Sequence, residues 1–335
     1  MAKMLRTALV MHPVVRDELL REDHLARLER AVALVGREPA RSVEALGPEL
    51  SRIEVLITSW GCPPVDAAVL ERMPKLKLIA HLAGSVKGFL DDAVWRRGIL
   101  VTNAVAANAV PVAEYTLAAI LFANKRVLQL SRAYQSYREN RAPWTREAPD
   151  VGNYRKTVGI VGASQVGRLV IRLLQPFDMD VLLYDPYVPP LAARELRVAK
   201  VTLSELLGRS DVVSLHAPLL PETRHMLGRR ELSLMKDGST LINTARGALV
   251  EPTALEAELA SGRLFAVLDT TEPEVLPPDS PLYELPNVFL TPHIAGSLGR
   301  EAERLTDYLV AEVERFARGV SLKYLVRREH LPRLA

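Results

Sequence analysis

The sequence predicts an α/β fold of two domains, each built on a parallel β-sheet. Three observations carry this prediction. The chain has 335 residues, which favours two hydrophobic cores over one. Short apolar runs alternate with longer segments of helical periodicity, which is typical of βαβ units. Hydrophobic residues make up 48% of the chain and charged residues 25%, as in an ordinary globular protein.

The first hundred residues predict a small α/β layer of their own. Apolar segments typical of strands occur at Arg6–Met11, Glu54–Ser59, Leu76–Ala83 and Leu100–Ala104. Helical patterns lie between them at Asp17–Leu34 and Asp66–Arg72.

A long helical pattern follows. From Val110 to Arg138 the apolar residues recur at helical spacing, which predicts one long helix. The polar, proline-containing stretch at 140–153 predicts a loop or linker.

The second half of the chain predicts another βαβ series. Its most strongly apolar strand is expected at Thr157–Val161. Further strands are expected at Val181–Asp185, Val212–Pro218, Ser239–Ala245, Leu264–Asp269 and Val288–His293. A last helix is expected at Gly299–Gly319, before a basic tail.

Charge and cysteine content narrow the possible functions. The formal net charge is only +3 and both signs are mixed along the chain, so we expect no nucleic-acid partner. Cys62 is the single cysteine, which excludes an internal disulfide and favours a reducing cytoplasm. We find no signal-peptide pattern and no run of about 18 apolar residues, so we expect a cytoplasmic protein without a membrane segment.

A glycine-rich turn follows the strand at Thr157–Val161. Gly162 and Gly167 occupy the first and third glycine positions of a G-x-G-x-x-G turn, and Ser164 occupies the middle position. A helical pattern comes next, so the turn matches a dinucleotide-binding fingerprint, in which a helix N-terminus points at the pyrophosphate. Ser164 adds a Cβ at the point of close approach, and we expect its hydroxyl to donate to phosphate.

Asp185 decides between this interpretation and an ordinary βα turn. It ends the next predicted strand, 18 residues after Gly167, where a carboxylate accepts hydrogen bonds from the adenosine ribose. The same carboxylate would repel a 2′-phosphate, so NAD is favoured over NADP. The alternative interpretation of Asp185 is a cap of the turn before Pro186.

Three further segments lie at predicted strand ends: Asn243–Glu251, Leu268–Leu276 and Leu290–Gly296. The carboxyl ends of parallel strands form the ligand-binding edge of an open sheet, so these segments should converge on the nicotinamide. Together with the glycine turn, and in this order, they resemble the D-isomer-specific 2-hydroxyacid dehydrogenase family. The resemblance runs from about residue 50 to 320 and is strongest from 156 to 297.

The resemblance implies a catalytic arginine, glutamate and histidine. Arg246 corresponds to the arginine of the NTARG segment, and His293 to the histidine of TPH. The family's glutamate lies five residues after the strand's aspartate, here Asp269, which selects Glu274. Glu272 precedes a proline, as the family's glutamate does, but it comes too early.

These residue types suit the reduction of a 2-keto acid. A guanidinium binds the carboxylate and polarises the carbonyl. His293 would give a proton to the new alkoxide, and would take it back in the oxidation. Glu274, hydrogen-bonded to the other ring nitrogen, would favour the imidazolium and hold the ring's orientation.

The same resemblance implies the cofactor contacts. They are Gly162, Ser164, Gln165, Val166, Gly167, Asp185, His216, Pro218, Thr223, Thr244, Ala245, Arg246, Asp269, His293 and Gly296. We expect His216 to be structural, because a cofactor wall needs shape more than acid–base chemistry.

The expected substrate contacts come from the first domain. They are Trp60, Gly84, Ser85, Val86, Lys87 and Asn108. The backbone amides of the loop from Gly84 to Lys87 could bind the carboxylate, and Trp60 could wall the pocket or belong to the core. Lys87 stands where relatives often have an acidic residue, so it either recognises a second anionic group on the substrate or is a solvated lysine on the loop surface.

The resemblance also implies the domain plan. Residues 1–103 and 297–335 would form a smaller, flavodoxin-like α/β substrate domain. Residues 104–296 would form a Rossmann-type doubly wound NAD domain, with the active site in the cleft between the two. The family usually forms homodimers through its cofactor domains.

Two alternatives use the same fold. Some relatives are transcriptional corepressors that sense NADH as binding modules, and a catalytic triad does not exclude this. Formate dehydrogenases resemble this chain but carry glutamine in place of the catalytic glutamate, so Glu274 argues against that activity.

Overall fold

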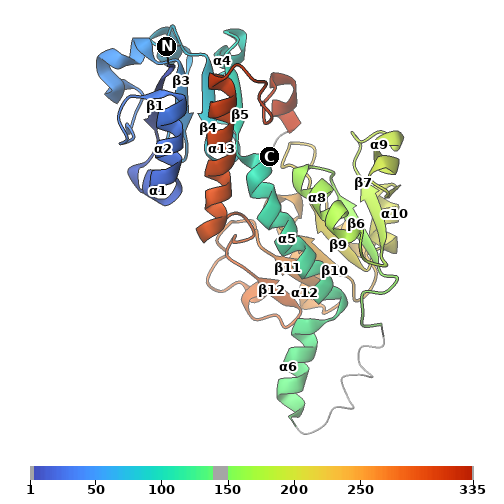
Figure 1. Cartoon of the computed structure of the whole chain (residues 1–335). Helices are drawn as coiled ribbons and strands as arrows, with labels where there is room; N and C mark the ends of the chain where they lie inside the picture. The colour runs from blue at the N-terminus through green and yellow to red at the C-terminus, as the bar shows by residue number, and fades with distance from the viewer. Residues whose placement is uncertain (1–3, 139–149, 334–335) are drawn as a thin grey trace. The chain divides into compact units, whose positions relative to one another are not determined.

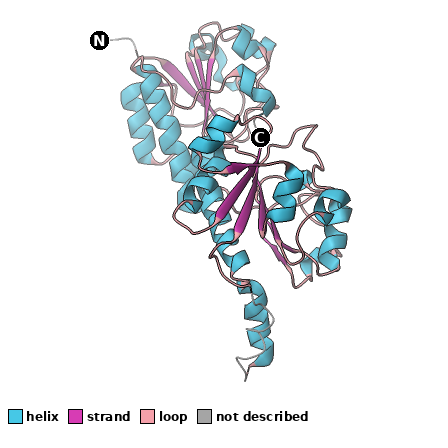
Figure 2. Ribbon diagram, turned by 90° about the vertical axis from the view of Figure 1, so that its right-hand side faces the viewer, coloured by secondary structure: helices cyan, strands magenta, loops and turns pink. Residues whose placement is uncertain are grey.

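The computed structural model of the chain describes residues 4–138 and 150–333, which form two compact units (Figure 1). Unit 1 consists of the residues up to 108 and those from 297 onward, and unit 2 of residues 109–296. The predicted loop at 140–153 lies for the most part outside the described residues. Helices cover both faces of each sheet (Figure 2).

Unit 1 contains a five-stranded sheet in the order β2-β1-β3-β4-β5, and every pair of neighbours is parallel. This is the flavodoxin-like strand order. The strands are β1 (Arg6–Val10), β2 (Ala33–Leu34), β3 (Val55–Thr58), β4 (Leu78–His81) and β5 (Leu100–Asn103). The helices are α1 (Pro13–Leu19), α2 (Glu22–Ala31), α3 (Ala67–Glu71), α4 (Ala93–Arg96) and α13 (Ala302–Ala317), with 3-10 segments η1 (Glu44–Arg52), η4 (Gly299–Glu301) and η5 (Arg328–Arg333).

Unit 2 contains a seven-stranded parallel sheet in the order β12-β11-β10-β9-β6-β7-β8. This is the doubly wound Rossmann order with one strand added, so the predicted fold class is confirmed. The strands are β6 (Thr157–Val161), β7 (Asp180–Tyr184), β8 (Ala199–Lys200), β9 (Val212–Leu215), β10 (Thr240–Asn243), β11 (Phe265–Leu268) and β12 (Val288–Leu290). The helices are α6 (Val127–Tyr137), α8 (Gln165–Leu174), α9 (Pro190–Glu195), α10 (Leu203–Arg209), α11 (Arg229–Ser233) and α12 (Pro252–Ala260), with 3-10 segments η2 (Gly247–Leu249) and η3 (Pro281–Tyr283); α5 (Val105–Asn124) enters unit 2 from unit 1.

The central strands of unit 2 contribute to two cores, which explains their continuous apolar sequences. In β10, for example, Leu241 and Ile242 are fully buried and face separate clusters on the two sides of the sheet. Burial of each such side chain contributes roughly 1.5–3 kcal/mol. The order in which successive strands join the sheet reverses between β6 and β9, and the carboxyl ends of the parallel strands form the edge where a ligand binds in this fold.

The predicted helix at Asp17–Leu34 is wrong as a single element. The chain forms α1 and α2, separated by an extended Arg21 with ψ of 168°, and Ala33–Leu34 form the short edge strand β2. A helical pattern that ran on through Val32 concealed this strand, because two residues are too few to show a period of their own.

The predicted single helix from Val110 to Arg138 is also wrong. The first helix, α5, already begins at Val105, and a break at Arg126 separates it from α6. Arg126 adopts φ of 48°, donates from its guanidinium to the carbonyl of Gly238 at 2.9 Å, and stacks over the ring of Phe265 at 4.5 Å. These tertiary contacts offset the cost of left-handed backbone and end the first helix.

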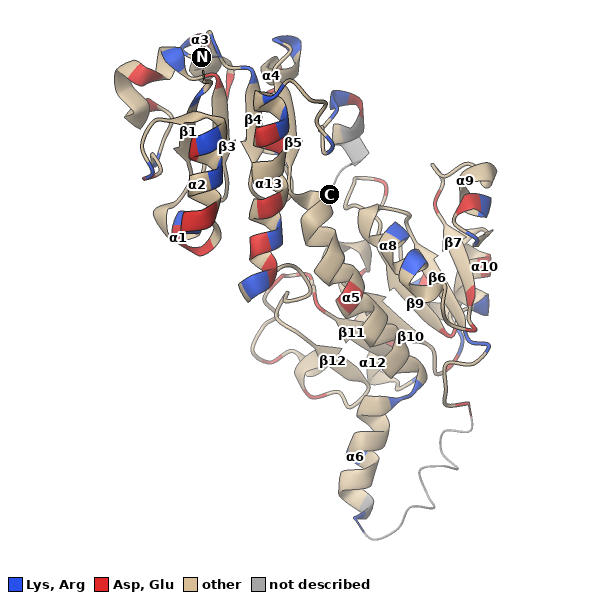
Figure 3. Cartoon of the chain, viewed as in Figure 1, with Lys and Arg blue, Asp and Glu red and all other residues tan. Residues whose placement is uncertain are grey.

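Contrary to our expectation, one described helix is long and apolar enough to cross a membrane. This helix is α5, whose 20 residues include a single charged residue, Glu114 (Figure 3). In the structure its residues Ala113, Thr116 and Ile120 are buried, which is the pattern of a core helix.

Candidate active site

The turn between β6 and α8 leaves room only for glycine at two positions. Gly162 has φ of 95°, and a Cβ there would lie 2.7 Å from the backbone nitrogen of Ala217. A Cβ on Gly167 would lie 2.1 Å from the carbonyl oxygen of Gly162. The turn is therefore a bare-backbone cradle, which fits a dinucleotide pyrophosphate.

Ser164 is the N-cap of α8. Its Oγ accepts from the backbone nitrogen of Gly167 at 3.3 Å, which satisfies one unpaired donor of the helix. The hydroxyl proton stays available for a ligand, so the predicted bond to phosphate stays a prediction. Gln165 is exposed in the first helical turn and Val166 is half-buried beside it.

Asp185 lies directly beside the turn. Its Oδ2 accepts from the backbone nitrogen of Ala163 and its Oδ1 from that of Tyr187, both at 2.8 Å. The bond to Tyr187 shows that Asp185 does cap the turn, as in the alternative interpretation. Both bonds hold the carboxylate at the carboxyl end of β7, and its predicted ribose contact stays a prediction.

The wall after β9 is built for shape. His216 is 3% exposed and shares a hydrogen bond of 2.9 Å between its Nε2 and Ser214 Oγ. Burial lowers the pKa of His216 to about 3, so its ring is neutral and acts as a structural group. Thr223 Oγ1 donates to the carbonyl of Pro218 at 2.6 Å and fixes the loop between them.

Arg246 follows β10 and is held through its backbone. Asn243, 1% exposed, donates from Nδ2 to the Arg246 carbonyl at 2.9 Å and accepts from the Ala245 nitrogen at 3.1 Å. The exposed Arg246 side chain donates once, from Nη1 to the Ala245 carbonyl at 2.6 Å. Thr244 is 7% exposed, and its hydroxyl lies 3.0 Å from that of Thr116 on α5.

Asp269 anchors the segment that carries His293. This carboxylate is 2% exposed and accepts from Thr291 Oγ1 at 2.6 Å, from the Ile294 nitrogen at 2.8 Å and from the Ala295 nitrogen at 2.9 Å. The predicted nicotinamide contact of Asp269 stays a prediction, and anchoring of this segment is a role that the sequence did not reveal.

His293 pairs with Glu274. The Nδ1 of His293 lies 2.5 Å from Glu274 Oε1, and the two side chains are 49% and 56% exposed. A carboxylate only accepts, so Nδ1 carries the hydrogen and Nε2 is the end left to face a ligand. His293 also adopts φ of 55°, a conformation that a non-glycine residue keeps only when its surroundings impose it.

Glu272, the competing glutamate, faces other partners. Its Oε2 lies 2.6 Å from His225 Nε2, and its Oε1 accepts from Arg224. The hydrogen bond to His225 is the main cause of the lowered pKa of Glu272. Glu274, which the spacing selected, is therefore the glutamate that contacts His293.

Arg246, Glu274 and His293 follow three neighbouring strands, β10, β11 and β12. Gly296, at the end of the His293 segment, is the last residue of unit 2 before the chain returns to unit 1. The arrangement of these strand ends can bind an anion, and it presents an imidazole whose second nitrogen is oriented by a carboxylate.

The predicted substrate residues belong to unit 1. Gly84, Ser85 and Lys87 lie on the loop after β4, whereas Val86 is 2% exposed and packs in the core. The side chain of Val86 is therefore unsuited to substrate contact, and only its backbone can serve. Partial burial lowers the pKa of Lys87.

Trp60 and Asn108 are the two remaining residues for which the sequence predicted a substrate contact. Trp60 is 52% exposed, which excludes the core interpretation and leaves the pocket wall as a prediction. Asn108 Oδ1 accepts from the Ser297 nitrogen at 2.8 Å. This bond links the two places, after residue 108 and before residue 297, where the chain passes between the units.

Two polar residues near the strand ends escaped the sequence analysis. Arg168 donates from Nε to the Ala163 carbonyl at 2.9 Å on the glycine turn. Tyr115 lies 2.7 Å from Thr291 and extends the network of Asp269 to α5. The last position of GIVGASQVGR could have signalled Arg168, but no local pattern marks Tyr115.

Comparison with known proteins agrees with this geometry. The family described as "D-isomer specific 2-hydroxyacid dehydrogenase, NAD binding domain" matches residues 117–295. Glyoxylate reductase of Korarchaeum cryptofilum is 36% identical over 269 residues, covering 79% of this chain and 80% of that protein. The crystal structure of a phosphoglycerate oxidoreductase from Rhizobium etli superposes with a TM-score of 0.84 at 25% identity, covering 98% and 99% of the two chains.

A third relative is longer than this chain. D-3-phosphoglycerate dehydrogenase of Methanocaldococcus jannaschii is 32% identical over 328 residues, which is 97% of this chain but 60% of that protein. The match covers 47% of D-3-phosphoglycerate dehydrogenase of Mycobacterium tuberculosis. The chain therefore spans about half to three fifths of these relatives.

Proposed function

The chain belongs to the D-isomer specific 2-hydroxyacid dehydrogenase family, and residues 117–295 are its NAD binding domain. From this premise we propose that it interconverts a small 2-keto acid and the D-2-hydroxy acid with NAD(H). The observation that carries the proposal is the contact between Glu274 and His293, after strands of the same parallel sheet whose β6 and β7 lead to the glycine cradle and its adjoining Asp185. The names of the relatives, glyoxylate reductase and D-3-phosphoglycerate dehydrogenase, support a small 2-keto acid.

The glycine cradle fits the pyrophosphate of NAD. Gly162, Ser164 and Gly167 would hold it through the backbone and the N-terminus of the ten-residue helix α8. Asp185 would accept from the ribose hydroxyls. NAD(H), when bound, supplies or accepts the hydride.

Arg246 would bind and polarise the keto acid. Within the described residues its side chain forms one hydrogen bond, to the Ala245 carbonyl, which uses one of five N–H donors, so the outer face of the guanidinium can pair with a carboxylate. Asn243 fixes the backbone at Arg246 and limits its movement.

His293 would move the proton at its Nε2. Glu274 accepts from Nδ1, orients the ring, and stabilises the imidazolium that gives its proton to the alkoxide oxygen. In the oxidation the same nitrogen takes the proton from the hydroxyl. Asp269 holds the His293 segment in place through Thr291, Ile294 and Ala295.

A substrate panel tests the proposal. The chain is assayed with NADH and NADPH against glyoxylate, pyruvate, 2-oxoglutarate and 3-phosphohydroxypyruvate. We expect turnover of at least one keto acid with NADH, and chiral analysis should find the D-hydroxy acid. NADH binding without turnover of any keto acid would favour the corepressor-like binding module instead.

We also propose a homodimer formed through unit 2. An apolar groove of about 210 Å³ lies between α5 and the β11–β12 edge, and Phe122 and Phe289 beside it are 55% and 39% exposed. The neighbouring helix α6 extends away from the sheet and contains a single charged residue, Arg132 (Figure 3). A second copy would cover this surface, and Phe122→Glu should shift the mass in light scattering from dimer to monomer.

A cytoplasmic location completes the proposal. The single Cys62 and the dependence on NAD(H) support it. Fractionation of the native cells, with detection by antibody, tests it.

A further inference from the structure

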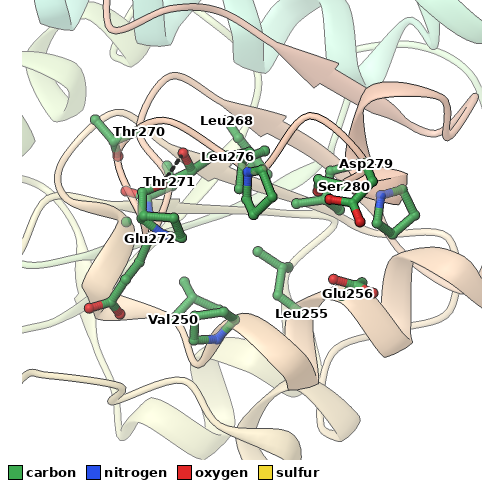
Figure 4. A pocket seen from close by; sticks show the side chains of 17 residues that line it. Val250, Leu255, Glu256, Leu268, Thr270, Thr271, Glu272, Leu276, Asp279 and Ser280 are labelled. Carbon is green, nitrogen blue, oxygen red and sulfur yellow. Dashed lines mark hydrogen bonds between the residues drawn. The ribbon is translucent and has the colours of Figure 1, made fainter.

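A second cavity lies behind the catalytic strand ends of unit 2. It has a volume of about 320 Å³ and is lined mainly by α12 and the chain from 268 to 282 (Figure 4). Its walls are largely apolar and include Val250, Leu255, Leu268, Leu276 and Leu282. Size and lining match those of small-molecule sites in proteins.

The cavity touches two of the three segments with proposed catalytic residues, namely those of Arg246 and Glu274. Asn243 and Gly247 line it, and they flank Arg246 in the chain. Thr271 and Leu276 line it on either side of Glu274. A Cβ on Gly247 would lie 2.0 Å from the carbonyl carbon of Thr271, so the two segments pack backbone against backbone at this wall.

The charged residues of the lining are all acidic. Glu256, Asp279 and Ser280 line the cavity and are drawn on the same side of it in Figure 4. Within residues 4–138 and 150–333, neither carboxylate forms an ion pair, whereas Glu272 is paired with Arg224 and His225. The rim therefore keeps two exposed carboxylates without a cation.

The wall also holds an unsatisfied polar group. Thr270 is 3% exposed, and its Oγ1 has no hydrogen-bond partner in the described part of the chain. Buried hydroxyls are normally paired, so the unpaired Oγ1 is an energetic cost at this wall.

We propose that this cavity binds a small organic cation with an apolar stem, and that its occupancy alters the activity of the catalytic strand ends. The stem fills the apolar interior, and the ammonium group pairs with Glu256 and Asp279. The bound molecule braces the chain on both sides of Glu274 and behind Arg246. Binding stands independently of the proposed function, whereas the effect on activity rests on it.

Calorimetry tests the binding. The probe is 2-phenylethylammonium chloride, compared with the neutral 2-phenylethanol and the anionic phenylacetate. We expect a dissociation constant of about 1 mM or below for the cation and binding at least about tenfold weaker for the other two. Equal binding of cation and alcohol, or no binding of the cation, would overturn the proposal.

Charge variants locate the site. The double variant Glu256→Gln/Asp279→Asn removes both rim charges from exposed positions, and should weaken binding of the cation at least about tenfold. Glu284→Gln removes an exposed charge of the same region outside the cavity, and should bind as the parent does. Parent-like binding by the double variant places the cation elsewhere and overturns the assignment.

A rate measurement tests the coupling. At saturating 2-phenylethylammonium, kcat/KM for the best keto acid should change by at least about twofold, in either direction. The double variant should show no such change. Binding without a rate change removes the coupling and leaves the binding site, and a chain without keto-acid activity refutes the proposed function while the calorimetric result stands.

Discussion

The glycine turn and the strand ends with the proposed catalytic residues lie along one edge of the same sheet, but the protein holds the two regions in opposite ways. The turn depends on missing side chains, because a Cβ on Gly162 or Gly167 would collide with backbone. The strand ends depend on exposed side chains, Glu274 and His293, which buried anchors such as Asp269 support from below. Changes in the turn should therefore damage cofactor binding and stability together, whereas changes of Glu274 or His293 should mainly damage the rate.

The largest effect should follow from His293→Asn. Asparagine accepts the left-handed backbone at this position but cannot transfer the proton, so kcat should fall by about 10²–10⁴. NADH affinity, measured by fluorescence titration, and the midpoint of thermal unfolding should stay close to those of the parent. An equal loss of NADH affinity would contradict the separation of the two regions.

Gly167→Ala should produce the complementary result. The new Cβ would lie 2.1 Å from the Gly162 carbonyl, so the turn must open and NADH affinity should fall by about a hundredfold, with a loss of stability of about 1–3 kcal/mol. Gly208→Ala in α10 is the matched control, since its Cβ would meet only the Leu234 carbonyl at 3.7 Å. Normal NADH binding by Gly167→Ala would show that the turn does not hold the cofactor.

The same contrast explains what the sequence could predict. Buried parallel strands are continuous apolar runs, so the sequence predicted the strands of unit 2 but not their order in the sheet. Glu274 could be chosen over Glu272 because the family that the sequence resembles has its glutamate five residues after the strand's aspartate, here Asp269. The anchors of Asp269 could not be predicted, because its partners Thr291, Ile294 and Ala295 come from the next strand's loop.

The predicted boundaries of the long helix were wrong for a related reason. The break at Arg126 follows from contacts with Gly238 and Phe265, more than a hundred residues away, and nothing in the local pattern marks it. The cavity near Glu274 could not be predicted either, because neither α12 nor the chain at 268–282 has a sequence pattern that indicates a binding site.

Asp185 should set the cofactor preference. A 2′-phosphate would face a carboxylate that two backbone nitrogens already hold in place, so kcat/KM with NADH should exceed that with NADPH by about ten- to a hundredfold. Asp185→Ser should narrow this ratio. Comparable values for the two cofactors with the parent protein would contradict the assignment.

Lys87 should have the smallest effect, because it lies on an exposed loop of unit 1. If its ammonium group recognises a second anion, Lys87→Met should lower kcat/KM for 2-oxoglutarate by about tenfold and leave that for pyruvate unchanged. Equal losses for both keto acids, or no loss for either, would refute a role in reading substrate charge.

The most direct test of the account compares the two glutamates through the pH dependence of keto-acid reduction. Glu274→Gln removes the carboxylate that stabilises the His293 imidazolium, so the upper pH limit of reduction should move to lower pH. Glu272→Gln should leave that limit where it is, because Glu272 pairs with His225 and Arg224. A shifted limit in Glu272→Gln with a parent-like profile in Glu274→Gln would contradict the assignment of the catalytic pair.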